Sequence, residues 1–199
     1  MEAVLAMVYR ASRFGALFGG VLIFLSALLL GVDVVIRKTL NTTIGGADEL
    51  AGYALATGSA LAFGFALFER THVRIDTLYG LFSVRLKMVL DLLGVIAILV
   101  FFYPVTRHAY AVLEQSAVSR TRSLSQLGTP LVVPQAIWVA GLGAFLLIAL
   151  LLLARAGLAF FAGDSNTVFR LIGPRGALEE LEQEIGNVQK VSEEKEVRP

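Results

Sequence analysis

Four long stretches without a charged side chain constrain this chain more than any other feature. They cover residues 14–32, 50–68, 92–106 and 123–154 of the 199-residue sequence. A helix that crosses a bilayer needs about 20 apolar residues, at a rise of about 1.5 Å each. Core helices of a soluble protein are the alternative, but a chain of this length cannot surround four such helices with polar elements. The sequence therefore predicts an all-α integral membrane protein.

The residues at the edges of these stretches set the limits of four predicted spans. The third span begins near Met88 and carries Asp91 at its headgroup end, and Pro134 lies near the start of the fourth, where its missing N–H costs little. The first span is too long for the apolar part of a secretory signal and is expected to remain as an anchor. The spans are expected at residues 14–36, 48–68, 88–109 and 133–155, within a membrane domain of residues 14–161 that follows an N-terminal segment of residues 1–13.

The distribution of lysine and arginine predicts the orientation. Four spans place both termini on one side of the membrane, and that side carries seven basic residues in its flanking segments against five on the other. Arg170 and Arg175, just beyond the fourth span, raise the count to nine. Because positive residues accumulate on the cytoplasmic side, both termini are expected in the cytoplasm.

The charged tail, residues 162–199, differs in kind from the rest of the chain. From Asp164 onward it holds eight acidic and five basic residues. Apolar residues recur within it at spacings of three, four and three, namely Leu178, Leu181, Ile185 and Val188. This spacing predicts a short amphipathic helix, either solvated on the cytoplasmic surface or docked on a partner.

Composition and motifs exclude most kinds of catalysis. The chain has no cysteine, which removes disulfides, zinc-thiolate sites and thiol nucleophiles. Its net charge of +1 argues against a nucleic-acid partner, and it contains no nucleotide-binding or hydrolase motif. His72 and His108 fall on opposite faces of the membrane, so they cannot share one haem. We predict no catalytic residue, metal or cofactor, and no enzyme activity.

Ionisable residues within membrane helices are functional candidates, and here they lie near the span ends. Asp33 is four residues before Arg37, and Asp91 is four residues after Lys87, so both acids can form ion pairs on their own helices. No charge remains at mid-depth, which argues against transport by this chain alone. The alternative is a small self-contained exchanger that acts as a dimer, with Asp33 as its coupling residue.

Three further features concern packing and contacts. Asp48 and Glu49 lie at the start of the second span, where their negative charges interact favourably with the helix dipole and Asp48 can cap free N–H groups. Pairing of these acids with a partner subunit is the alternative. The polar–apolar alternation of residues 72–76 fits an extended strip against a neighbouring chain or an ordinary loop. Gly15 and Gly19 have the spacing that allows helices to approach closely, and glycines recur in the second span.

The order of these motifs resembles a known family. Residues 46–50 read Gly-Ala-Asp-Glu-Leu, residues 72–76 read His-Val-Arg-Ile-Asp, and residues 129–135 begin with Thr-Pro and end with Pro-Gln before Trp138 in the fourth span. In this arrangement, over about residues 14–155, the chain resembles the small membrane subunit of tripartite ATP-independent periplasmic (TRAP) transporters, the DctQ-type four-helix subunit.

This resemblance implies a role in transport in which this chain catalyses no reaction. In such systems a periplasmic binding protein captures an organic acid, and a large multi-span membrane subunit carries it inward. The small subunit is a non-catalytic scaffold for the large one in the bacterial inner membrane. The residues that the resemblance suggests as partner contacts are Asp48, Glu49, Arg70, His72, Arg74 and Asp76. The outer loops, residues 37–47 and 111–132, are expected to face the periplasm and the binding protein.

Overall fold

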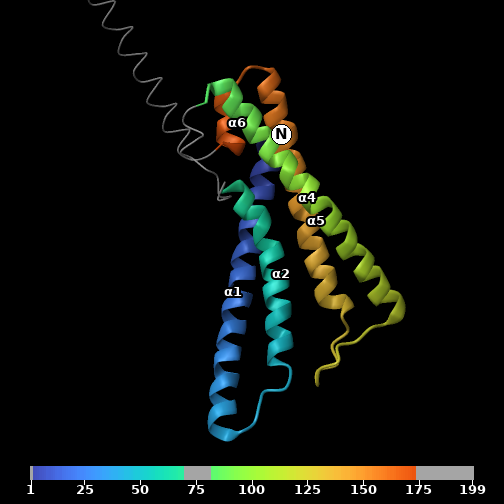
Figure 1. Cartoon of the computed structure of the whole chain (residues 1–199). Coiled ribbons are helices and arrows are strands. Elements are labelled where there is room, and N and C mark those ends of the chain that lie inside the picture. The colour runs from blue at the N-terminus through green and yellow to red at the C-terminus, as the bar shows by residue number, and fades with distance from the viewer. Residues whose placement is uncertain (1, 70–81, 174–199) are drawn as a thin grey trace, which may run out of the picture. The chain divides into compact units, whose positions relative to one another are not determined.

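The computed structural model describes residues 2–69 and 82–173 (Figure 1). The regular secondary structure of these residues is α-helical. Its helices are α1 (Glu2–Leu40), α2 (Ala47–Phe68), α4 (Val84–Ser119), α5 (Val132–Phe161) and α6 (Ser165–Ile172). The first four of these are long and apolar enough to cross a membrane. The predicted fold class, an all-α protein with four membrane helices and a short helix after them, is confirmed.

Helices α1, α2 and α4 are longer than the uncharged stretches of residues 14–32, 50–68 and 92–106 that predicted them. α4 continues ten residues beyond position 109, and its 36 residues are about 54 Å long, against about 30 Å of bilayer hydrocarbon. Loss of hydropathy marks the membrane boundary, whereas helix ends depend on local propensity, and alanine, leucine, glutamate and glutamine continue the helix here. The second outer loop is therefore residues 120–131 rather than 111–132.

The chain divides into two compact units. One consists of Met1–Glu69 with Ile98–Leu150, and the other of Arg70–Ala97 with Leu151–Pro199. α4 and α5 each contribute to both units. The first unit therefore holds α1, α2, the second half of α4 and the first half of α5, together with both outer loops.

In the first unit, α1 and α2 form an antiparallel pair in close backbone contact (Figure 1). A Cβ atom built on Gly58 would lie 2.7 Å from the carbonyl oxygen of Gly19, and one built on Gly19 would lie 2.5 Å from the carbonyl oxygen of Gly58. Gly15 faces the backbone of Leu61 in the same way. The close approach predicted from these glycines is confirmed.

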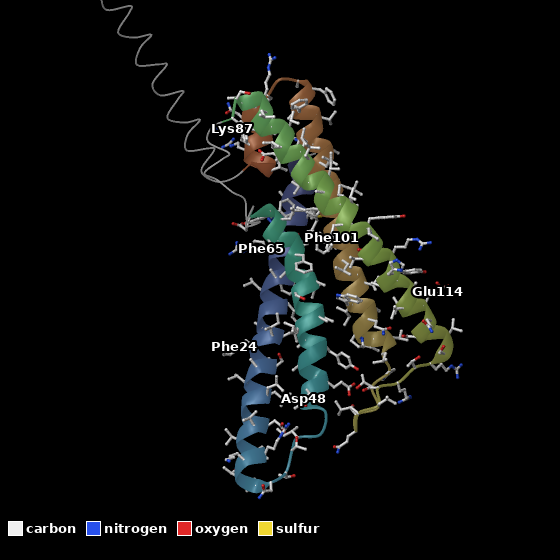
Figure 2. All side chains as sticks on the ribbon, viewed as in Figure 1. Phe24, Asp48, Phe65, Lys87, Phe101 and Glu114 are labelled. Carbon is white, nitrogen blue, oxygen red and sulfur yellow. The ribbon has the colours of Figure 1, made fainter. Side chains whose placement is uncertain are left out.

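An aromatic cluster joins the remaining elements of the first unit. Phe145 of α5 is 1% exposed, and its ring centroid lies 4.7 Å from that of Phe102 in α4 and 5.8 Å from that of Phe63 in α2. Leu142, one turn before Phe145, is also buried. Phe24 of α1 instead points away from α2 and is 63% exposed (Figure 2).

In the second unit, α6 begins with a side-chain cap and turns its apolar residues inward. The Asp164 carboxylate accepts the backbone N–H of Thr167 at 3.1 Å and also its hydroxyl, while Val168 and Phe169 are buried. Asp91 of α4 is buried as well; its predicted pair with Lys87 stays a prediction. The predicted tail helix between Leu178 and Val188 lies outside the described residues.

Replacement of Asp164 with alanine is expected to fray α6 without disturbing α5. The two Thr167 donors hold the pKa of the Asp164 carboxyl below its ordinary value. The cap therefore stabilises α6 fully at pH values above the ordinary pKa, and this stabilisation is lost as the pH falls through the lowered pKa. Amide hydrogen exchange should report faster exchange at Thr167 and Val168 in the variant, and in the wild type at acid pH. Unchanged exchange in the variant would show that the cap contributes nothing to α6.

Candidate functional site

A buried carboxylate at the end of α1 holds the first outer loop. Asp33 is 1% exposed and pairs with Arg37, four residues later, at 2.5 Å. Its other oxygen accepts the hydroxyl of Thr43 at 2.8 Å and the backbone N–H of Ile44 at 2.6 Å. The ion pair predicted from the sequence is confirmed. Its larger role, however, is to attach the loop of residues 41–46 to α1.

Substitution of Asp33 with alanine should release this loop while α1 stays helical. The Ile44 amide then loses its acceptor, and its hydrogen exchange is expected to accelerate by about tenfold. Thr43→Val tests the same link more mildly, because it removes one donor and leaves the Ile44 bond intact. An Ile44 amide that exchanges at the wild-type rate in both variants would contradict this role.

A second carboxylate, at the start of α2, holds the second outer loop. Glu49 accepts the hydroxyl of Tyr53, one turn later, at 2.6 Å, and the hydroxyl of Ser125 in the loop of residues 120–131. The backbone N–H of Leu127 in turn donates to the Ser125 hydroxyl at 3.1 Å. Glu49 therefore ties α2 to a loop 76 residues further along the chain.

The two outer loops also contact each other directly. Gly46 has a φ of 87°, a conformation that favours glycine, and a Cβ atom there would lie 2.4 Å from the Leu127 side chain. A Cβ atom on Gly45 would overlap the side-chain oxygen of Gln126. We call residues 41–46 and 120–131, with Asp33 and Glu49 that hold them, the loop platform.

A pocket of about 540 Å³ opens on the loop platform. Most of its lining residues have polar side chains, including Arg37, Thr43, Asp48, Glu49, Ser125 and Gln126. The guanidinium and the hydroxyl and amide groups offer donors, while the two carboxylates offer acceptors. The lining therefore offers both donors and acceptors.

The structure changes the interpretation of Asp48. The N-cap of α2 is Gly46, which has no side chain to accept a hydrogen bond, so the predicted capping by Asp48 is wrong. Asp48 instead lies in the first turn of α2, exposed and next to the first outer loop (Figure 2). Its charge still complements the helix dipole. Of the two adjacent acids, Glu49 is engaged within the chain and Asp48 faces outward.

The other predicted contact residues, Arg70, His72, Arg74 and Asp76, lie outside the described residues. Sequence reasoning missed the roles of Thr43, Tyr53 and Ser125. Tyr53 follows Glu49 at the spacing of one helical turn, a signal that was available. Ser125 carried no signal, because only folding brings its loop to Glu49.

The distribution of charge defines the class of protein. Across the parts of the chain that the structure describes, no group of three His, Cys, Asp or Glu side chains could hold a metal ion. Charged side chains on the four long helices lie outside the uncharged stretches of residues 14–32, 50–68, 92–106 and 123–154. The fold is that of a multi-pass helical membrane protein.

Comparison with known proteins agrees with this class. The family model for the DctQ component of tripartite ATP-independent periplasmic transporters matches residues 26–158. The chain belongs to this family and is a small component of a TRAP transporter. No curated protein and no solved structure matches it significantly.

Proposed function

We propose that this chain is the non-catalytic small permease subunit of a TRAP transporter for organic acids in the bacterial inner membrane. The observation that carries the proposal is a family match over residues 26–158, which includes all or part of each of the four long apolar helices. A transporter that bound an anionic substrate itself would need polar groups at mid-depth. The chain therefore supplies a frame, and the large subunit supplies the transport path.

The loop platform supports a second role, contact with the periplasmic binding protein. Its loops are held by hydrogen bonds to Asp33 and Glu49, so little conformational entropy is lost when a partner binds. Its exposed donors and acceptors fit a polar, transient interface.

Co-purification followed by reconstitution tests the proposal. A C-terminally tagged chain extracted in mild detergent should retain a large multi-span subunit in about equal amount. Proteoliposomes that contain both subunits and the binding protein should take up an organic acid, and those without this chain should not. Full uptake by the large subunit alone would contradict the proposal.

The alternative, a self-contained exchanger, rests on Asp33 as a coupling residue. Asp33 already accepts bonds from Arg37, Thr43 and Ile44, so it is engaged in structure rather than free to exchange ions. Transport by the purified chain alone in liposomes, abolished by Asp33→Asn, would favour this alternative.

Charge reversal at Asp48 tests a predicted partner contact. Asp48→Arg should lower the yield of the complex by about fivefold, because an exposed acid at an interface becomes a like charge against its basic partner. Glu114→Arg, a reversal at an exposed position of α4, is the matched control and should leave the yield unchanged. Equal yields from both variants would remove Asp48 from the interface. Reversals at Arg74 and Asp76 test the 72–76 strip in the same assay.

A further inference from the structure

The second outer loop, which joins α4 to α5 (Figure 1), folds back on itself as a small closed hairpin. The backbone N–H of Ser123 donates to the carbonyl of Thr129 at 2.9 Å, and the N–H of Leu131 donates to the carbonyl of Thr121 at 3.1 Å. The residues between these two bonds form an isolated antiparallel bridge. Both arms of the loop are therefore fixed, and residues 124–128 form its tip.

The tip is held by further hydrogen bonds that centre on Ser125. Its backbone N–H donates to the Ser123 hydroxyl at 3.2 Å, and its own hydroxyl accepts the N–H of Leu127 at 3.1 Å. The same hydroxyl donates to the Glu49 carboxylate of α2. The N–H of Gly128 donates to the Ser125 carbonyl at 3.2 Å. The tip thus has one defined conformation, and α2 supports it from outside the loop.

Leu124 projects from this fixed tip and is fully exposed. A single exposed leucine is ordinary on a protein surface. Leu124 differs because the backbone on both sides of it is already held, so a partner that buries it has little backbone to order. Burial of its side chain in an apolar pocket would be favourable, since the side chain is in contact with water until then.

The charge of the loop indicates the chemistry of the surface that covers Leu124. Arg120 and Arg122 are exposed, and the loop of residues 120–131 contains no acidic residue. Glu49, whose carboxylate accepts the Ser125 hydroxyl, offsets part of this positive charge. A partner surface with carboxylates around its apolar pocket would therefore complement the loop.

A lipid bilayer is the other apolar environment that Leu124 could enter. Arg122 and Gln126, two residues before and two residues after it, are both exposed. Hydrocarbon around the tip would remove water from a charge and an amide as well as from the leucine, and it offers neither of them a hydrogen bond. A protein surface can bury the leucine and still bind the polar groups beside it, as interfaces with an apolar centre and a polar rim do.

We propose that Leu124 is an anchor that inserts into an apolar pocket of the periplasmic binding protein, with Arg120 and Arg122 against carboxylates at the rim of that pocket. This inference rests on the proposed contact between the loop platform and the binding protein, and it names the residue that carries the contact. The hairpin acts as a preformed finger, and the rest of the platform supports it.

Binding of the purified binding protein to the immobilised complex of this chain with the large subunit tests the anchor. Leu124→Ser should weaken binding about tenfold, because the apolar contact is lost, and most of the change should be faster dissociation. Leu124→Met keeps the apolar volume and should bind within about twofold of the wild type. Leu40→Ser is the matched control, since Leu40 is also an exposed leucine but lies at the end of α1, outside the second outer loop.

The rim is tested by charge reversal in the same assay. Arg120→Glu should slow association about fivefold at low salt and much less at high salt, because ions screen an exposed charge. Arg107→Glu reverses an exposed cation of α4 outside the loop and should leave the rate unchanged. Faster association of Arg120→Glu would show that the partner surface is basic and would overturn this part of the proposal.

Photo-cross-linking from position 124 in intact cells identifies what covers the tip. The expected product joins this chain to the same binding protein that the purified complex binds. A product with lipid, with the large subunit or with a second copy of this chain would overturn the proposal. Equal affinities of Leu124→Ser and the wild type would reject the anchor and leave the proposed function standing, whereas a wild-type complex that never binds the binding protein would contradict both.

Discussion

Gly58→Leu is expected to separate α1 from α2 and to destabilise the protein by about 3 kcal/mol. The new side chain would begin 2.7 Å from the Gly19 carbonyl oxygen and 3.0 Å from the Ile23 side chain. A backbone atom cannot move aside as a flexible side chain can, so the helices must shift apart. Because α1 carries Asp33, the shift should also displace the first outer loop.

Thermal unfolding in detergent measures this effect, and a second glycine of α2 supplies the control. Gly52 is exposed and has open space around its Cβ position, so Gly52→Leu should unfold at the wild-type temperature. The yield of the complex with the large subunit should fall with Gly58→Leu alone. Equal unfolding temperatures for the two variants would show that the glycine contact does not hold the pair together.

Phe145→Ala should have the second largest effect, a loss of about 2–3 kcal/mol. The substitution leaves a cavity between α2, α4 and α5, where the rings of Phe63 and Phe102 now pack against Phe145. In a membrane the unfolded helices stay in lipid, so the cost comes from lost packing rather than from transfer to water. We therefore expect a loss at or below the lower end of the range of about 3–5 kcal/mol known for soluble proteins.

Phe24→Ala is the matched control for this cavity. Phe24 points away from α2 (Figure 2) and is 63% exposed, so lipid can occupy the space that its ring leaves. Its removal should change stability by well under 1 kcal/mol. Similar losses for Phe24→Ala and Phe145→Ala, measured by unfolding in the same detergent, would contradict the assignment of Phe145 to the core.

The four membrane helices were predictable from the sequence because the bilayer imposes one strong rule. Backbone polar groups in hydrocarbon must be satisfied within the segment, so a long uncharged stretch becomes a helix. The Asp33–Arg37 pair was predictable for a related reason, since a spacing of four residues lies on one helix face. The glycines that allow α1 and α2 to approach were visible as a spacing, although the sequence did not tell which partner they meet.

Only the tertiary structure decided how the two acids are used and how the outer loops are joined. Glu49 and Ser125 lie 76 residues apart, and no local pattern connects residues that meet through packing. Asp48 was expected to cap α2, yet the N-cap residue is Gly46, whose backbone is left-handed. Hydropathy records the thickness of the membrane, whereas the joining of the outer loops depends on contacts between distant segments.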